Sequence, residues 1–246
     1  MTREELSILN VGNNLDQLMN LDPRGYGVCR ILYEGSRAYA GEPVSMHCAK
    51  ALNSMLEPGD IVYIMTGFIL RPETDGIVGA ILLARALVEA YDVKPVIVCP
   101  EENVVAIKNC SPLIGMHLYE DISTLLEMPQ SFGVYPFTKK MEEVEENIHR
   151  LFSYGLPKVL ISTEAPGANK KGEYHNAVGI NMTELEAKMD GLFDAVKNLG
   201  IKTFAVGDLG NEIGMGAIGE HIRKYIPYAA EGECQCGCGG GLLART

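Results

Sequence analysis

The sequence has 246 residues, of which 47% are hydrophobic and 22% are charged. This is the composition of an ordinary globular protein, not of a disordered or collagen-like chain. Lys and Arg number 21 against 32 Asp and Glu, so the formal net charge is −11, and the basic footprint of a nucleic-acid-binding protein is missing.

We expect neither a targeting signal nor a membrane span. The first residues, MTREELSILN, are charged and lack the apolar core of a signal peptide. The longest apolar run, within residues 77–91, is interrupted by Arg85 and Glu89 and is shorter than the roughly 20 residues that cross a bilayer. The seven cysteines do not resemble a secreted disulfide framework. The predicted location is therefore the cytoplasm, with no nucleic acid and no membrane as partner.

Helices and strands are predicted in alternation along the chain. A helix is expected near residues 3–20, the stretch 23–41 is hard to assign, and a helix follows Pro43. Buried strands are predicted at residues 61–67, 96–99, 158–163 and 202–208, with a weak strand near 115–119. The other helices are predicted at residues 77–91, 101–109 and 139–153, from the capping-box pattern of Thr183 and Glu186 to Leu199, and up to Tyr225.

This alternation determines the expected fold class. Strands separated by helices at this spacing imply right-handed crossovers and a parallel sheet covered on both faces. We expect a three-layer α/β/α sandwich with a mostly parallel sheet and Rossmann-like crossovers. A single domain is predicted over residues 1–246, with residues 1–42 as an N-terminal extension packed on it. The apolar helix 77–91 is compatible with either internal packing or the interface of a homo-oligomer.

Carboxylates follow three of the predicted strands. They are Glu73 and Asp75, then Glu164, then Asp208 and Glu212. Ligands of parallel α/β sheets bind outside the carboxyl ends of the strands, so these side chains are expected at one edge. Hard divalent cations take oxygen ligands, which predicts a site for Mg²⁺ or Mn²⁺. The alternative is that Asp75 and Asp208 only cap the helices that follow them.

The segment GDLGNEIGMGAIG holds five glycines in thirteen residues at a strand-to-helix turn. Glycines there permit tight turns and close approach of the backbone to a ligand, and exposed amides at a helix start bind anions. Residues 214–219 also fit the pattern GxGxxG. That pattern should begin directly after a strand, and several residues intervene here, so a dinucleotide cofactor is disfavoured.

Three cysteines, Cys234, Cys236 and Cys238, alternate with other residues near the end of the sequence. In an extended chain they would face one side, which makes a site for a soft metal conceivable. Zinc sites usually space their cysteines two to four residues apart and need a fourth ligand, so a tight glycine turn near the active edge is the alternative. A further strand is expected after this segment, and on that expectation the sequence is a truncated form.

Three segments resemble the D-glutamate cyclase family, specifically its C-terminal module. They are TGFILRPETDGIVGAILLARAL (66–87), STEAPGANKKGEYHNAVG (162–179) and GDLGNEIGMGAIGEHI (207–222). The resemblance runs from about Pro43 to Gly241, with Leu209 where the family usually has Gly. It implies an α/β domain linked to the conversion of D-glutamate into 5-oxo-D-proline and water.

The resemblance and the carboxylates together suggest a metal-dependent lyase acting on a small acidic metabolite. A metal held by Asp75, Asp208 and Glu212, with Glu73 as a further ligand, would polarise the γ-carboxylate. The predicted substrate-binding residues are Thr66, Gly67, Gly76, Asn169, Lys170, Asn211 and Gly214. The predicted catalytic residues, which would move protons, are Glu164, His175 and Tyr174. For His175, which lies in a long polar loop, a plain surface role is the alternative.

Two other functions fit the same residues. Clustered carboxylates beside a glycine-rich anion site also suit a metal-dependent phosphohydrolase. A non-catalytic module that binds a metabolite is the second alternative, and it predicts stabilisation by the ligand without turnover.

Overall fold

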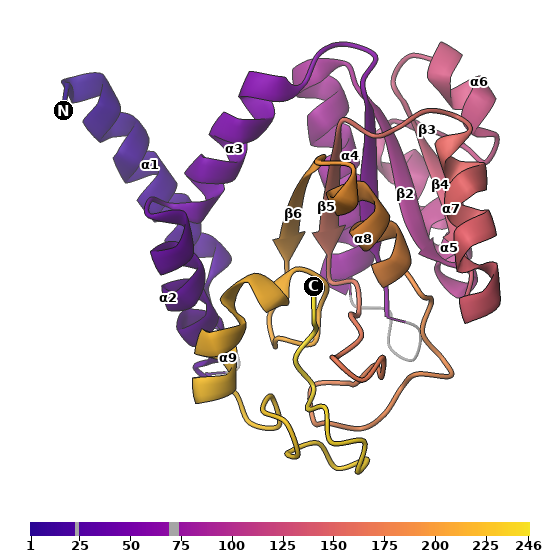
Figure 1. The fold of residues 1–246 in the computed structure, drawn as a ribbon. Helices are drawn as coiled ribbons and strands as arrows, with labels where there is room; N and C mark the ends of the chain where they lie inside the picture. Colours follow the sequence, from indigo (N-terminus) through magenta and orange to yellow (C-terminus); the bar gives the residue numbers. More distant parts are fainter. Residues whose placement is uncertain (23–24, 69–73) are drawn as a thin grey trace.

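The computed structural model describes residues 1–22, 25–68 and 74–246. Its centre is a parallel sheet of six strands in the order β3-β4-β2-β1-β5-β6 (Figure 1). The strands are β1 (Ile61–Thr66), β2 (Lys94–Pro100), β3 (His117–Tyr119), β4 (Ser131–Phe137), β5 (Val159–Thr163) and β6 (Lys202–Val206). The expected parallel α/β sheet is thus confirmed.

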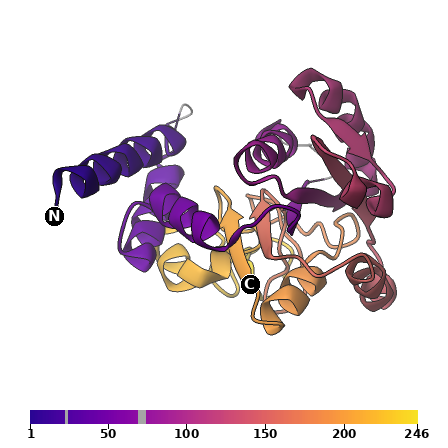
Figure 2. The ribbon, with the colours of Figure 1, turned by 90° about the horizontal axis from the view of Figure 1, so that it is seen from above.

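Helices cover both faces of the sheet, as Figure 2 shows from above. The helices of the described chain are α1 (Arg3–Met19), α2 (Val28–Ala40), α3 (Val44–Met55), α4 (Thr74–Tyr91), α5 (Glu101–Cys110), α6 (Ile122–Glu127), α7 (Val144–Phe152), α8 (Asp190–Asn198) and α9 (Gly219–Tyr225). One core contains residues of α4 and α5, and the other contains residues of α6, α7 and α8. These are the three layers of the predicted sandwich.

Strand β1 shows how its sequence divides between the two cores. Val62 and Ile64 belong to the core under α4, whereas Tyr63 and Met65 belong to the core under α7 and α8. Every second side chain of a strand points to the same face, so a strand covered on both sides must be apolar throughout. The hydroxyl of Tyr63 donates to the carbonyl of Gly155 at 2.8 Å, which satisfies its polar atom inside the core.

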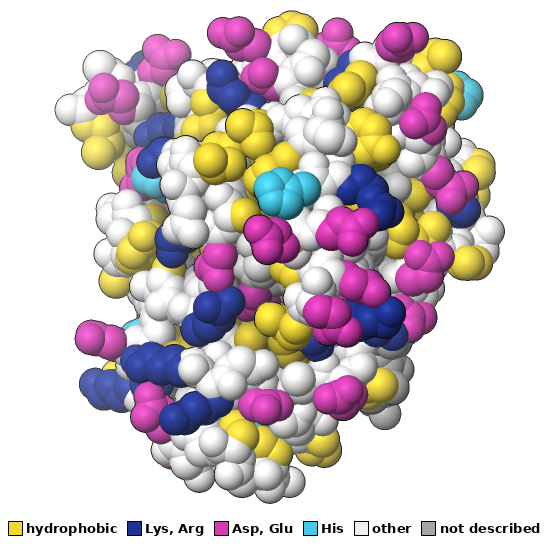
Figure 3. Space-filling view, turned by 45° about the vertical axis from the view of Figure 1, so that its right-hand side comes forward, with side chains coloured by type: hydrophobic (Ala, Val, Ile, Leu, Met, Phe, Trp, Pro, Cys, Tyr) yellow, Lys and Arg dark blue, Asp and Glu magenta, His cyan; other side chains and the backbone are white. Residues whose placement is uncertain are grey.

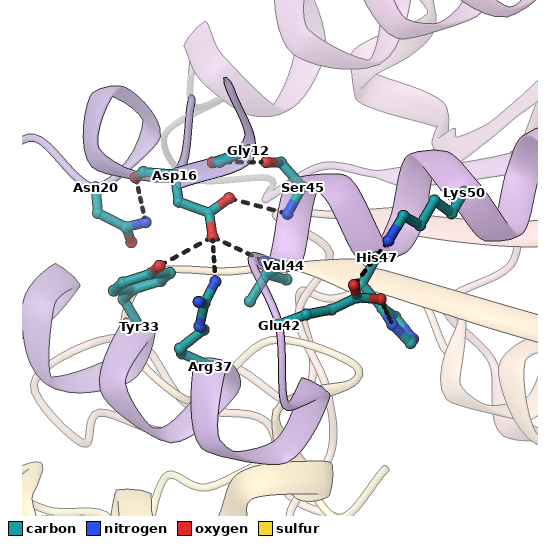
Figure 4. Close-up of polar contacts among 10 residues, drawn as sticks. All are labelled: Gly12, Asp16, Asn20, Tyr33, Arg37, Glu42, Val44, Ser45, His47 and Lys50. Atoms are coloured by element: carbon teal, nitrogen blue, oxygen red, sulfur yellow. Dashed lines mark hydrogen bonds and ion pairs between the residues drawn. The ribbon is translucent and has the colours of Figure 1, made fainter. Parts of the chain in front are cut away.

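The three N-terminal helices pack against one another at the side of the sheet that ends in β6 (Figure 1). Asp16 of α1 is 2% exposed and joins them (Figure 4). It accepts hydrogen bonds from the backbone of Val44 at 2.7 Å and of Ser45 at 2.9 Å, and from the hydroxyl of Tyr33 at 2.9 Å. Asp16 therefore caps the first turn of α3, whose own N-cap residue, Pro43, offers no side-chain acceptor.

Several elements differ from the sequence expectation. Helix α2, helix α6 and strand β4 were not predicted. The helix expected to start at the Thr183–Glu186 capping box begins only at Asp190. The hydroxyl of Thr183 is engaged elsewhere, because it accepts from the backbone of Tyr174 and donates to the carboxylate of Glu173. A local capping pattern has thus been used to hold two loop segments together.

Two further properties of the described chain are the length of its helices and the charges on its surface. None of the described helices is long and apolar enough to cross a membrane. On the face drawn in Figure 3, acidic side chains lie among the basic ones.

Candidate functional site

The sheet reverses its strand order at β1. After β1, the chain forms β2, β3 and β4 on one side of β1, and then β5 and β6 on the other side. Such a switch point, at the carboxyl ends of the strands, is where ligands of open α/β sheets bind. Register pairs Thr66 of β1 with Thr163 of β5, and Thr163 with Val206 of β6. The segments that follow these three strands therefore start at the same level of the same edge.

Three carboxylates from two of these segments form a cluster at this edge. Oxygen atoms of Glu164, Asp208 and Glu212 all lie within 4.8 Å of one another. Glu164 is 5% exposed and Glu212 is 1% exposed, while Asp208 is half-buried. Buried carboxylates at such distances repel one another, and a hard divalent cation is the usual compensation. We call these three residues the carboxylate cluster.

The backbone of Glu164 has an unusual conformation. Its φ is +50°, in the left-handed region, although it is not a glycine. Such a residue costs about 1–3 kcal/mol, and residues of this kind gather at active sites and ligand clamps. The N–H of Glu164 donates to the carbonyl of Val206 at 3.0 Å, so the strained residue remains tied to the end of β6.

Glu212 is held by its own loop. Its carboxylate accepts hydrogen bonds from the backbone N–H groups of Gly210 at 2.8 Å and Leu209 at 3.2 Å. A Cβ atom on Gly207 would lie 2.9 Å from Oε2 of Glu212, so this position needs glycine. Asp208 lies in a bend of this loop and does not cap a helix, because the next helical turn starts at Met215 with Gly214 as its N-cap residue.

Thr66 and Gly76 lie beside Glu164 of the carboxylate cluster, and Gly67 follows Thr66 in the chain. A Cβ on Gly76 would lie 3.1 Å from Oγ1 of Thr66 and 3.2 Å from Cβ of Glu164, so these three residues are neighbours. The Oγ1 of Thr66 is buried and has no hydrogen-bond partner within the described ranges. Gly67 has a φ of +113° and packs closely against the buried amide of Asn103, a residue that the sequence pattern did not single out.

Of the two other predicted metal ligands, Asp75 is not in the carboxylate cluster. It is exposed in the first turn of α4. Glu73 lies outside the described residues. Of the predicted ligands, Asp208 and Glu212 come together, and Glu164, predicted as a catalytic residue, joins them.

Other predicted substrate-binding residues hold the loops in place. The amide of Asn169 donates to the carbonyl of Gly241 at 2.7 Å, and the amide of Asn211 donates to the carbonyl of His175 at 2.9 Å. Gly214, with a φ of +97°, packs on Ala205. Lys170 is exposed and pairs with Glu231 at 3.3 Å.

The close approach that the glycine-rich segment permits is to the chain itself. The backbone N–H of Gly216 donates to the carbonyl of Thr246 at 2.7 Å, and that of Gly214 donates to the same oxygen at 3.0 Å. A Cβ on Gly216 would lie 2.7 Å from that oxygen. The glycines thus seat the C-terminal segment against the loop that carries Glu212.

Tyr174 is buried and directed at another carboxylate. Its hydroxyl donates to Asp190, whose other oxygen accepts the N–H of Ala168 at 2.9 Å. Burial raises the pKa of Tyr174, and the charge of Asp190 raises it further. Burial also raises the pKa of Asp190, against the hydrogen bonds from Tyr174 and Ala168. The Tyr174 hydroxyl therefore holds its proton firmly in a structural hydrogen bond.

His175 lies in a second cluster, with the three cysteines. Its side chain is 1% exposed, and its Nε2 lies 3.1 Å from Sγ of Cys236 and 3.6 Å from Sγ of Cys238. One ligand atom each from His175, Cys234, Cys236 and Cys238 lies within 4.8 Å of the others. Burial lowers the pKa of His175, so the ring is neutral at neutral pH. We call these four residues the His–Cys cluster.

Comparisons with known proteins agree with the family that the motifs suggest. A match to human mitochondrial D-glutamate cyclase is 41% identical over 70 residues, which is 28% of this chain and 11% of the human protein. The chain therefore matches only a small part of that relative's length. The family model described as "D-glutamate cyclase-like, C-terminal" matches residues 15–246. By this match the chain belongs to the D-glutamate cyclase-like C-terminal family.

Proposed function

We propose that this chain is a metal-dependent lyase that converts D-glutamate into 5-oxo-D-proline and water. The observation that carries the proposal is the carboxylate cluster of Glu164, Asp208 and Glu212 at the switch point of the sheet. Membership of the D-glutamate cyclase-like family supports the choice of reaction. The human relative bears the name of that activity, and the match to it covers a small part of its length.

The carboxylate cluster suits Mg²⁺ or Mn²⁺. These are hard cations that prefer oxygen ligands, and this cluster offers carboxylates alone, whereas the His–Cys cluster offers sulfur and nitrogen. Asp208 and Glu212 would hold the ion. When bound there, it would polarise the γ-carboxylate of the substrate.

Glu164 is the residue that we assign to proton transfer. The reaction joins the α-nitrogen of glutamate to the carbon of its γ-carboxylate and breaks one of the bonds from that carbon to oxygen. The ammonium group gives up two protons, and both end on the departing oxygen, which leaves as water. Glu164 can accept a proton from the nitrogen and return it to that oxygen, because a single carboxylate can serve as base and then as acid. The Oγ1 of Thr66, which is buried beside Glu164, would bind a carboxylate of the substrate.

The ligand, the location and the assembly belong to the same proposal. A small acidic metabolite is the expected partner, and the cytoplasm is the proposed location. Helix α4 exposes Val78 and Leu82, which are 37% and 50% exposed, and these residues offer a place for a second copy of the chain.

Incubation of the purified chain with D-glutamate or L-glutamate, with Mn²⁺ or with a chelator, tests the proposal. Chiral chromatography should detect 5-oxo-D-proline only with the D isomer and only with metal. Asp208→Asn and Glu164→Gln should each lose at least about a hundredfold in kcat. Glu145→Gln, which changes a carboxylate that is 91% exposed, is the matched control and should keep full turnover.

Two results would favour another function over the proposed one. Release of inorganic phosphate from phosphate esters, without any 5-oxoproline, would favour the phosphohydrolase. Thermal stabilisation by D-glutamate without turnover would favour a metabolite-binding module. Full turnover in the presence of chelator would remove the metal from the mechanism.

A further inference from the structure

The His–Cys cluster brings together residues that lie far apart in the sequence. His175 follows β5, and the cysteines come after α9, about sixty residues later. Besides the His175 contacts, Sγ of Cys234 lies 3.4 Å from Sγ of Cys238 and 3.6 Å from Sγ of Cys236. Four soft or borderline donor atoms thus converge on one point.

We infer that His175, Cys234, Cys236 and Cys238 form a structural zinc site. Zn²⁺ prefers a tetrahedron of Cys sulfur at about 2.3 Å and His nitrogen at about 2.0–2.1 Å, and a Cys₃His set is one of its standard structural sites. Such a tetrahedron spaces its sulfurs about 3.8 Å apart and places the nitrogen about 3.5 Å from each. The four separations given above, 3.1–3.6 Å, lie close to these values.

The backbone around the cysteines is shaped to bring the sulfurs together. Instead of an extended strand, the segment is a series of turns in which Gly237, Gly239 and Gly241 all have positive φ. The N–H of Cys238 donates to Sγ of Cys236 at 3.4 Å, and the N–H of Gly240 donates to Sγ of Cys238 at 3.3 Å. Backbone donors to sulfur stabilise the thiolate form, which is the form that binds a metal.

The orientation of His175 and an access route complete the requirements. The Nε2 atom of His175 faces the sulfurs, as a metal-binding nitrogen must. Cys236 is exposed and Cys238 is half-buried, so an ion can reach the site from solvent. Four protein ligands fill a tetrahedron and leave no open position for substrate, so the site is structural and not catalytic.

The same distances argue against the other uses of three cysteines. A disulfide requires sulfurs about 2.05 Å apart, and the cysteines of this segment are free thiols. An iron–sulfur cluster spreads its ligands around several irons, whereas these four ligand atoms lie within 4.8 Å of one another. The geometry is that of a single ion.

The site would fasten the C-terminal segment to the loop between β5 and α8. Asn169 bonds to Gly241 on one side, and Asn211, the residue before Glu212, bonds to His175 on the other. A zinc ion would therefore hold the surroundings of the carboxylate cluster without taking part in the reaction. This gives His175 the role of metal ligand in place of the predicted proton carrier.

Metal analysis of the full chain, purified without chelator, tests the inference. We expect about one zinc per chain, and after its removal we expect Co²⁺ to restore the site with the visible absorption of a tetrahedral thiolate complex. Zinc below about a tenth per chain, together with no such absorption on Co²⁺ addition, would overturn the inference. So would a disulfide between two of the three cysteines in the freshly purified protein.

Variants give a second test, which measures zinc content and the Co²⁺ spectrum instead of activity. Cys236→Ser and His175→Ala should lower zinc content at least about tenfold, whereas Cys110→Ser and His149→Ala, outside the cluster, should keep it. His175→Cys should retain zinc, because Cys₄ is also a structural zinc set, and should shift the Co²⁺ spectrum by adding a thiolate. Zinc retained in full by Cys236→Ser and His175→Ala would place the ion elsewhere and refute the site.

Discussion

The side-chain amide of Asn211 donates a 2.9 Å hydrogen bond to the backbone carbonyl of His175. Asn211 is 2% exposed and His175 is 1% exposed, so the bond is formed away from water. Because Glu212 follows Asn211 directly, this bond joins the loop of the carboxylate cluster to the His–Cys cluster.

Asn211→Ala should therefore destabilise the protein. The variant leaves the buried carbonyl of His175 without its donor, which costs about 1–3 kcal/mol. Urea unfolding at neutral pH measures the loss, and Asn198→Ala, at an exposed position at the end of α8, should change the free energy of unfolding far less. Equal stability of the two variants would show that the bond contributes nothing.

Gly76 and Gly79 of α4 offer a matched pair for testing the carboxylate cluster. Alanine at either position favours the helix by about 1 kcal/mol over glycine. A Cβ on Gly76 would press on Glu164 and Thr66 at 3.2 Å and 3.1 Å, whereas among the described residues a Cβ on Gly79 would meet only Oγ1 of Thr163 at 4.0 Å.

We expect Gly76→Ala to lower kcat with D-glutamate by about tenfold to a hundredfold, because small displacements of a reacting group are costly. Gly79→Ala should keep full turnover and gain slightly in stability. Steady-state kinetics and thermal unfolding of both variants make the comparison. Similar kcat values for the two would mean that the position of Glu164 does not limit the reaction.

The elements that could be predicted are those with a regular apolar pattern. Strands β1, β2, β5 and β6 are short apolar runs, and helices such as α3 and α7 carry apolar residues at helical spacing. Strand β4 (Ser131–Phe137) was missed because Gly133 and Pro136 interrupt its pattern. Pro136 is exposed, and Gly133 leaves space for Ile122 and Leu125 of α6, whose side chains would lie 2.8 Å from a Cβ there. These reasons become visible only when the neighbouring helix is in place.

The candidate site divides in the same way. The residues after β1, β5 and β6 could be placed at one edge because parallel strands share their direction, which put Glu164 and Glu212 in the same region. The meeting of His175 with the cysteines could not be predicted in this way. It depends on a succession of turns after α9, and no periodic pattern encodes their direction.

Tyr174→Phe separates a structural role from a catalytic one. The variant removes the hydrogen bond to the buried Asp190, and we expect a loss of about 1–3 kcal/mol in the free energy of unfolding. The kcat of the folded enzyme should change less than about threefold, because the hydroxyl is already committed to Asp190. A hundredfold loss of kcat with normal urea unfolding would instead make Tyr174 the acid of the reaction.

Asp16 should make the protein sensitive to acid. Burial acts to raise the pKa of Asp16, but its hydrogen bonds to Ser45, Val44 and Tyr33 outweigh this, and the net pKa lies below the ordinary 3.8. The folded state therefore releases this proton more readily than the unfolded state. The stability from Asp16 is fully present above the unfolded value and is lost as the pH falls through the lower, folded value.

Comparison of the wild type with Asp16→Asn isolates this contribution from those of the other carboxylates. Asn cannot ionise. The difference in the free energy of unfolding between the wild type and Asp16→Asn should therefore stay constant from about pH 7 to about pH 5 and should shrink below about pH 4. Urea unfolding across this range measures it, with Glu145→Gln, which changes a carboxylate that is 91% exposed, as the control. A difference that stays constant down to about pH 2 would mean that the charge of Asp16 does not stabilise the junction of α1, α2 and α3.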